Sequence, residues 1–72
     1  MSRLEKTVRI NLPAVRVNAN MNQKEWAEAL KVDLSTVTNW EKGRTEPSAS
    51  QLRLMSELSG IPMDNIFCAQ QS

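Results

Sequence analysis

Residues 22–43, with the sequence NQKEWAEALKVDLSTVTNWEKG, decide the fold of this 72-residue chain. Asn22 is followed three positions later by Glu25, which is the spacing of a capping box, where each side chain caps the other residue's backbone N–H. A helix is therefore expected over about 23–30. Apolar side chains at helical spacing form its inward face and continue into the next turn, namely Trp26, Ala27, Leu30 and Val32.

A second helix is expected over about 34–42. Asp33 gives it a similar box-like start, and Gly43 is the residue type that commonly follows a helix in the left-handed conformation. Val37 and Trp40 lie three residues apart and would face inward.

The connection between these helices, residues 30–33, is short. A turn of three or four residues is too short for a well-packed antiparallel pair and suits two helices that cross at a steep angle, the arrangement called a helix-turn-helix. The small side chain of Ala27 would let the two backbones approach, and Val32 would fill the turn. The sequence therefore predicts a helix-turn-helix.

The segment before this pair contains an arm and a helix. The β-branched run Thr7-Val8-Arg9-Ile10 suits a short extended segment or a flexible arm. The first helix is expected to begin at the cap residue Asn11, because Pro13 fits a first helical turn and not a helix interior. Leu12 and Val15 would form its buried face.

After the pair, a fourth helix is expected between the cap residue Ser48 and Gly60. Its core stripe is expected at intervals of three: Leu52, Met55 and Leu58. Residues 61–67 suggest a last short helical turn whose Ile66 and Phe67 close the core. The predicted fold is all-α, a five-helix bundle with a short extended N-terminal arm: arm 1–10, helix-turn-helix domain 11–68, tail 69–72.

Composition narrows the range of functions. The chain has no His, no Tyr and one Cys, Cys68, so the common general bases and nucleophiles are mostly missing and a single thiol cannot build a metal site. We expect no enzyme activity, metal, cofactor or small-molecule ligand. No apolar run approaches the roughly 18 residues of a membrane span, and the charged first ten residues do not resemble a signal peptide. A cytoplasmic protein without membrane contact is expected.

Charge is distributed unevenly along the chain, although the net charge is only +1. Residues 1–24 carry five basic residues and one Glu, a net charge of +4, whereas residues 25–72 carry a net charge of −3. An anionic partner should therefore meet the N-terminal third, with Lys42 and Arg44 added where folding brings them close.

Polar side chains dominate the outward face of the helix over 34–42. The outward positions are Leu34, Ser35, Thr38 and Asn39, with Thr36 and Lys42 beside them. Asn can bond adenine through two hydrogen bonds, Ser and Thr can bond phosphates or base edges, and Leu can contact a thymine methyl group. The same residue types would also simply keep an exposed helix soluble, so composition leaves both interpretations open.

From Leu12 to Phe67 the chain resembles the phage repressor/Cro helix-turn-helix family. The landmarks, in order, are Arg16, residues 22–27, Val32, residues 35–37, residues 39–44, Pro47-Ser48, Gln51-Leu52 and residues 58–61. The resemblance implies a sequence-specific transcription regulator of the bacterial nucleoid, built of five short helices, the third of which enters the major groove of double-stranded operator DNA. It also implies a homodimer, because one small module makes few base contacts. We expect the dimer to form around the fourth helix and Ile66-Phe67.

The resemblance also assigns roles to particular residues. Gln23 matches a glutamine that bonds a backbone phosphate, and Asn22 and Lys24 are expected to assist it. The positions that match base-reading residues are Leu34, Ser35, Thr38 and Asn39, flanked by Thr36. Lys42 and Arg44 match a basic loop that grips phosphate. Arg16 and Glu41 match a structural ion pair between the first and third helices.

Three departures from the family's pattern support a second hypothesis. Lys31 occupies a turn position that is usually Gly, Glu46 stands where basic residues are common, and Leu34 places an apolar group on the outward face. Such a face would suit an antirepressor that binds a partner repressor protein and blocks its DNA binding, anchored by Met21, Leu34 and Leu54. An antitoxin would fit the same scaffold without a dedicated feature. Arg3, Lys6 and Arg9 of the arm either contact phosphates or belong to a plain tail.

Overall fold

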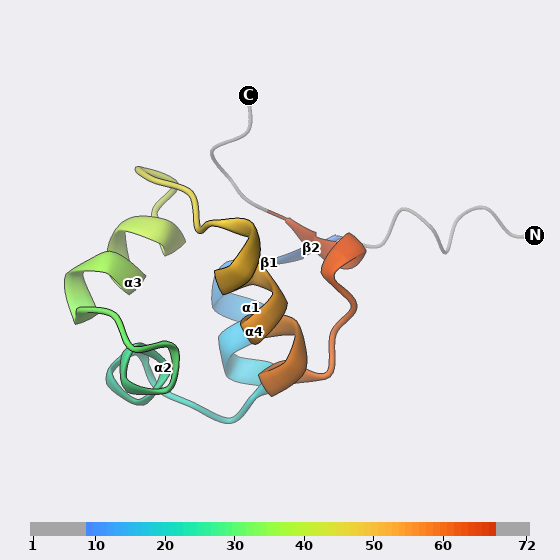
Figure 1. Ribbon diagram of the computed structural model, residues 1–72, viewed down its shortest axis with the longest axis horizontal. Coiled ribbons are helices and arrows are strands. Elements are labelled where there is room, and N and C mark those ends of the chain that lie inside the picture. The colour runs from blue at the N-terminus through green and yellow to red at the C-terminus, as the bar shows by residue number, and fades with distance from the viewer. Residues whose placement is uncertain (1–8, 68–72) are drawn as a thin grey trace, which may run out of the picture.

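The structure, a computed structural model, describes residues 9–67 and shows four α-helices, one 3-10 turn and a pair of two-residue strands in that part of the chain (Figure 1). In chain order these elements are β1 (Ile10–Asn11), α1 (Leu12–Asn18), α2 (Gln23–Leu30), α3 (Leu34–Glu41), α4 (Ala49–Ser59), η2 (Met63–Asn65) and β2 (Ile66–Phe67). The rest of the predicted arm, with Arg3 and Lys6, and the predicted tail lie outside the described residues.

Side-chain caps begin three of the four α-helices. Asn11 Oδ1 accepts a hydrogen bond from Ala14 N at 2.9 Å, and Ser48 Oγ accepts one from Gln51 N at 3.3 Å. The predicted capping box is confirmed, because Asn22 Oδ1 accepts from Glu25 N and Glu25 Oε1 accepts from Asn22 N. The prediction for α3 was wrong in one respect. Asp33 is its N-cap, but its side chain makes no capping bond, and only its carbonyl oxygen accepts from the first turn.

A left-handed residue follows each of the four α-helices, and after α1 it is Asn20, with φ 61°. Gly43 and Gly60 have φ 78°, so both predicted glycine stops are confirmed. Lys31 has φ 60° and ψ 44° at the end of α2, as expected for a position that is usually Gly. A non-glycine residue in this conformation carries a steric cost. The turn between α2 and α3 is therefore mildly strained.

One hydrophobic core joins the helices. Its most deeply buried large side chains are Trp26, Leu30, Met55, Val15 and Val37, and it is completed by Leu12, Ala27, Trp40 and Ile61. All four α-helices contribute to it, so each buries one apolar face and leaves the opposite face to solvent.

The predicted stripe of α4 was wrong at its last residue. Leu58 is 36% exposed, whereas Ser59 turns inward, where its hydroxyl donates to Met55 O and accepts from Ile61 N. Steps of three residues drift off a helix face because one turn takes 3.6 residues, so the seventh position after Leu52 faces the core and the sixth does not. Ile61, which the helical pattern passed over, fills the core instead.

The predicted fifth helix is also corrected. Only Met63–Asn65 forms a turn, of the 3-10 type, closed by a hydrogen bond from Asn65 N to Pro62 O at 2.9 Å. The chain then becomes extended at Ile66, where β2 pairs in parallel with β1 in the register Ile10 with Ile66. The backbone groups at Ile66 therefore form hydrogen bonds with a strand that lies 56 residues earlier in the sequence, in place of the hydrogen bonds within a helix. Ile66 packs against the core, while the side chain of Phe67 lies outside the described part.

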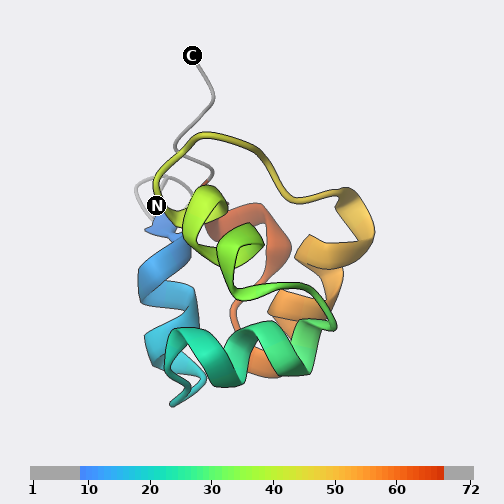
Figure 2. The same cartoon turned by 90° about the vertical axis from the view of Figure 1, so that its left-hand side faces the viewer.

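The two central helices cross at a steep angle, as the short turn predicted. Figure 1 looks along α2 while α3 runs across the view, and Figure 2 shows α2 lengthwise along the bottom. α3 packs against α2 and α1, which places it at one end of the molecule with its other side uncovered.

Candidate nucleic-acid interface

The outward face of α3 is the first part of the candidate site. Val37 and Trp40 are buried and fix the rotation of the helix, so the predicted outward positions face solvent to different degrees. Leu34 is 48% exposed and Ser35 is exposed, whereas Thr36, Thr38 and Asn39 are half-buried. The N-terminal end of α3 is therefore its most accessible part.

Two outward side chains of α3 already have hydrogen-bond partners. Thr38 Oγ1 donates to Leu34 O at 3.1 Å, which leaves its oxygen as an acceptor. Arg44 Nη1 donates to Asn39 Oδ1 at 3.5 Å, a long and weak bond on the surface. The amide nitrogen of Asn39 stays available, and its Oδ1 keeps a second lone pair, so both atoms that a bidentate contact to adenine uses can still bond.

The N-terminus of α2 is the second part. Backbone N–H groups in the first turn of a helix have no intrahelical acceptor, so those of Gln23 and Lys24 are available to an anion. Asn22 uses Oδ1 for the cap and keeps its side-chain N–H₂ group. Both Asn22 and Lys24 are exposed.

A hydrogen-bonded network ties α2 to α3 through Gln23. Its Nε2 donates to Glu41 Oε1 at 3.0 Å. Glu41 also accepts from Arg16, at 2.8 Å on Oε2 from Nε and at 3.3 Å on Oε1 from Nη2. Because Nε2 of Gln23 carries two hydrogens, one donor remains after the bond to Glu41. The carboxylate thus orients the amide at the start of α2.

The Arg16–Glu41 ion pair is largely removed from solvent. The side chain of Arg16 is 16% exposed and that of Glu41 is 8% exposed. Arg16 Nη1 also donates to Met21 O at 3.0 Å, in the turn before α2. The ion pair expected from the family resemblance therefore connects α1, the following turn and α3.

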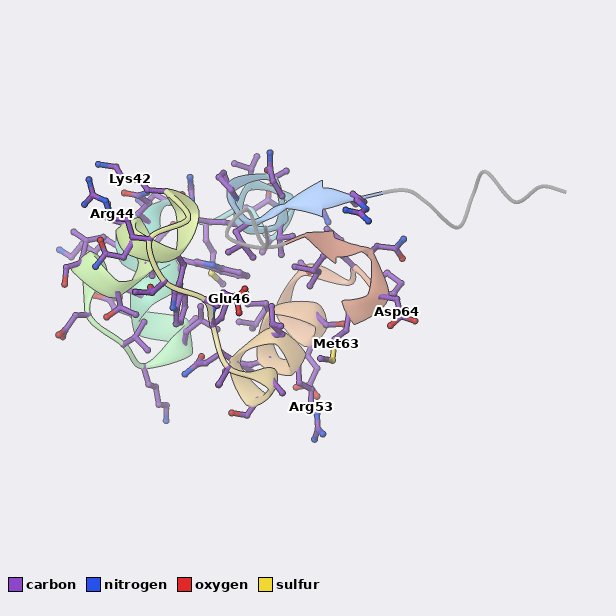
Figure 3. The ribbon with its side chains drawn as sticks, turned by 90° about the horizontal axis from the view of Figure 1, so that it is seen from above. Lys42, Arg44, Glu46, Arg53, Met63 and Asp64 are labelled. Carbon is purple, nitrogen blue, oxygen red and sulfur yellow. The ribbon has the colours of Figure 1, made fainter. Side chains whose placement is uncertain are left out.

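The loop after α3 supplies exposed charge. Lys42 and Arg44 lie together at the end of α3 in Figure 3, and Glu46 lies farther along the same loop. All three are exposed. The basic pair thus adjoins the outward face of α3, and the acidic residue is separate from it.

Sequence reasoning identified Gln23, Arg16 and Glu41 but missed that Gln23 joins the ion pair. Gln23 and Glu41 are 18 residues apart, and no local spacing rule links them. The family resemblance gave Glu41 one partner only. Three-dimensional proximity was the missing information.

Residues 9–67 lack two other kinds of site. No helix there is long and apolar enough to span a bilayer. In the same part of the chain, no group of three or more Cys, Asp, Glu or His residues is placed to hold a metal ion.

Comparison with known proteins agrees with this architecture. The family model described as "Helix-turn-helix" matches residues 14–66. A named relative, the HTH-type transcriptional activator BcrR of Enterococcus faecalis, is 25% identical over 60 residues, which cover 83% of this chain and 29% of the relative. The chain thus spans less than a third of that protein's length, and no solved structure matches it. Because the family model covers most of the chain, this protein belongs to the helix-turn-helix family, of the Cro and repressor type that its landmark residues resemble.

Proposed function

We propose that this protein is a sequence-specific DNA-binding transcription regulator in which α3 lies in the major groove. The observation that carries the proposal is the bond from Gln23 to Glu41, because it fixes a phosphate donor relative to the end of α3. A helix-turn-helix docks in this way, with one helix across the backbone and the second among the base edges. The relative BcrR is a transcriptional activator, which is in keeping with this function.

Base reading is assigned to the outward side chains of α3. Leu34 and Ser35 are the most exposed and would enter the groove first, with Leu34 against a thymine methyl group. Asn39 would bond adenine through its amide nitrogen and the second lone pair of Oδ1. Thr38 would accept a hydrogen bond from a base amino group, since its own hydrogen goes to Leu34 O.

Contacts to the DNA backbone, which would position the protein on the duplex, are assigned to the start of α2 and to the residues that follow α3. At α2, the free donor of Gln23 and the first backbone N–H groups would bond one phosphate, supported by Asn22 and Lys24. Beside this site, because Gln23 is bonded to the last residue of α3, Lys42 and Arg44 would hold a second phosphate, and the hydroxyl of Thr36 on α3 would add a polar contact to the DNA. Two anchored phosphates fix the register in which α3 meets the bases.

The regulator is proposed to act in the cytoplasm as a homodimer of the Cro type. A single module of this size buries little DNA surface, whereas two copies double the base contacts and require a pseudo-palindromic site. The half-sites should lie about one helical turn apart, or a multiple of it.

The antirepressor hypothesis finds less support in the described contacts. Of its three proposed anchors, Met21 and Leu54 pack against the core, which leaves Leu34 as the exposed one. One apolar side chain offers little to a protein partner, since interface energy concentrates in clusters of buried residues. DNA binding is the function that more of the site supports.

The test begins with double-stranded DNA selected from a random pool by the full chain. Gel shifts on the selected operator should show Gln23→Ala losing about tenfold or more in affinity and Asn39→Ala about fivefold or more, because a hydrogen bond to a charged group contributes about 1.5–3 kcal/mol and a bidentate base contact about 1–3 kcal/mol. Val17→Ala, 61% exposed on α1, is the matched control and should bind like the parent.

Unchanged affinity in both variants would refute the docking. Failure to select any sequence, together with a stable complex with a partner repressor in a pull-down, would instead favour the antirepressor.

A further inference from the structure

Asp33 carries a carboxylate without a partner at the start of α3. The residue is exposed, and within residues 9–67 its side chain makes no capping bond, no other hydrogen bond and no ion pair. The other three α-helices begin with a side chain that caps an N–H three residues later, as Asn22 caps Glu25. In α3 the corresponding N–H, that of Thr36, donates instead to the carbonyl oxygen of Asp33 at 3.0 Å. The carboxylate is therefore free to accept hydrogen bonds from another molecule.

This carboxylate lies at the end of α3 that would meet DNA first. Asp33 directly precedes Leu34 and Ser35, the two exposed residues of the helix. Figure 1 shows the start of α3 at the left-hand edge of the molecule, on the side away from α1 and α4. When a helix-turn-helix docks, residues at the N-terminal end of the second helix contact base edges. Under the proposed docking, the side chain of Asp33 thus faces the major groove.

The chemistry of a carboxylate selects among the bases that it can meet there. A carboxylate only accepts hydrogen bonds, and the donors in the major groove are the amino groups of cytosine and adenine. Adenine presents the acceptor N7 beside its amino group, whereas guanine and thymine present acceptors and no donor. Cytosine is the base whose edge presents a donor and no acceptor. It is therefore the base that a carboxylate binds with least repulsion.

We propose that Asp33 is a specificity-determining residue that accepts a hydrogen bond from the amino group of one cytosine for each bound protomer. The assignment rests on the proposed DNA function and adds to it a base contact that comes from the turn before α3. Its discrimination has an attractive part and a repulsive part, because the same negative charge disfavours bases that present acceptors. An uncapped carboxylate at this place otherwise only weakens the attraction of the protein for phosphates.

The experiment selects double-stranded DNA from a random pool with the full chain and then measures the affinity for each base at every operator position. The parent should prefer cytosine at one base pair, distinct from the adenine contact of Asn39, and any other base there should cost about fivefold or more in affinity. Asp33→Ala should accept all bases at that position and keep the other preferences. Asp33→Asn has nearly the same shape and gains an N–H₂ group, so it should prefer adenine there.

A matched control separates base reading from general charge effects. Glu46→Gln removes an exposed carboxylate from the loop after α3 and should keep the preference for cytosine. Circular dichroism should show all variants folded, because the substituted residues are exposed. An Asp33→Ala variant that binds every sequence more tightly, with the parent's base preferences unchanged, would overturn the proposal, since the carboxylate would then act only by repulsion.

Failure of this inference is distinguishable from failure of the DNA function. An operator whose base preferences change in Asn39→Ala but not in the Asp33 variants would overturn the role of Asp33 alone. A parent chain that selects no sequence would overturn the DNA function and this inference with it.

Discussion

Gln23 and Glu41 are joined by a hydrogen bond of 3.0 Å from Nε2 to Oε1, which connects the first residue of α2 to the last residue of α3. Arg16 completes the network from α1. Three helices therefore meet at one carboxylate that is 8% exposed. The group proposed to bind phosphate and the helix proposed to read bases are held by the same side chain, so loss of Glu41 should disturb both stability and docking.

Removing one partner of the Arg16–Glu41 ion pair should lower the stability of the domain more than removing both partners. Arg16→Met would leave the carboxylate of Glu41 in a largely buried position without its cation, which we expect to lower the free energy of unfolding by about 3 kcal/mol. The double variant Arg16→Met/Glu41→Leu should recover most of this loss because no unpaired charge remains. Urea unfolding followed by fluorescence checks both, since Trp26 and Trp40 are buried and will report on loss of the core. A single variant as stable as the parent would contradict the structural role of the pair.

Lys31 should be replaceable by glycine with a gain in stability. A φ of 60° costs a residue with a Cβ about 1–2 kcal/mol, and glycine avoids this steric cost. Glycine in turn loses more conformational entropy on folding, which offsets about 0.5–1 kcal/mol of the gain. Lys31→Gly should therefore stabilise the domain by about 0.5–1 kcal/mol and raise Tm by a few degrees. Lys31→Ala removes the same charge and keeps the Cβ, so it should show no comparable rise. Equal Tm shifts in the two variants would mean that charge, and not backbone strain, is responsible.

The salt dependence of operator binding should identify the phosphate contacts. Each contact neutralised by a basic side chain contributes about 0.9 to the slope of log affinity against log salt concentration. Lys42→Ala and Arg44→Ala should each lower the magnitude of that slope by about 1 without changing the selected sequence. Lys31→Ala, which removes a charge from the turn between α2 and α3, is the control and should keep the parent's slope. Unaltered slopes in the Lys42 and Arg44 variants would show that the loop after α3 does not contact the DNA phosphates.

Local chemistry made much of this fold predictable from the sequence. The caps at Asn11, Asn22 and Ser48 involve residues three apart, and the stops at Gly43 and Gly60 depend on one residue's backbone freedom. Such features follow from nearest neighbours and are visible in the sequence. The inward rotation of α3 was equally accessible, because Val37 and Trp40 are its two large buried residues.

What the sequence could not supply depends on contacts between distant segments. Extended pairing of Ile10 with Ile66 replaced the expected fifth helix, and neither residue's neighbours encode its partner. Ile61 fills the core through tertiary packing that no local pattern encodes, whereas the misplacement of Leu58 was a local error, because steps of three residues drift off a helix face. The hydrogen bond from Gln23 to the ion pair was likewise not predictable from local sequence, because Gln23 and Glu41 are 18 residues apart.

The central claim is that α3 reads bases in the major groove. Its most direct test is the base preference of Asn39→Ala, measured at every position of the operator by selecting from a pool randomised around the parent's site, with Lys42→Ala as the comparison. We predict that Asn39→Ala loses the preference for adenine at one base pair of each half-site and keeps the others, while Lys42→Ala keeps the full pattern at lower affinity. A parent chain that enriches no sequence, or an Asn39→Ala variant that enriches the parent's sequence with undiminished preference, would contradict the claim.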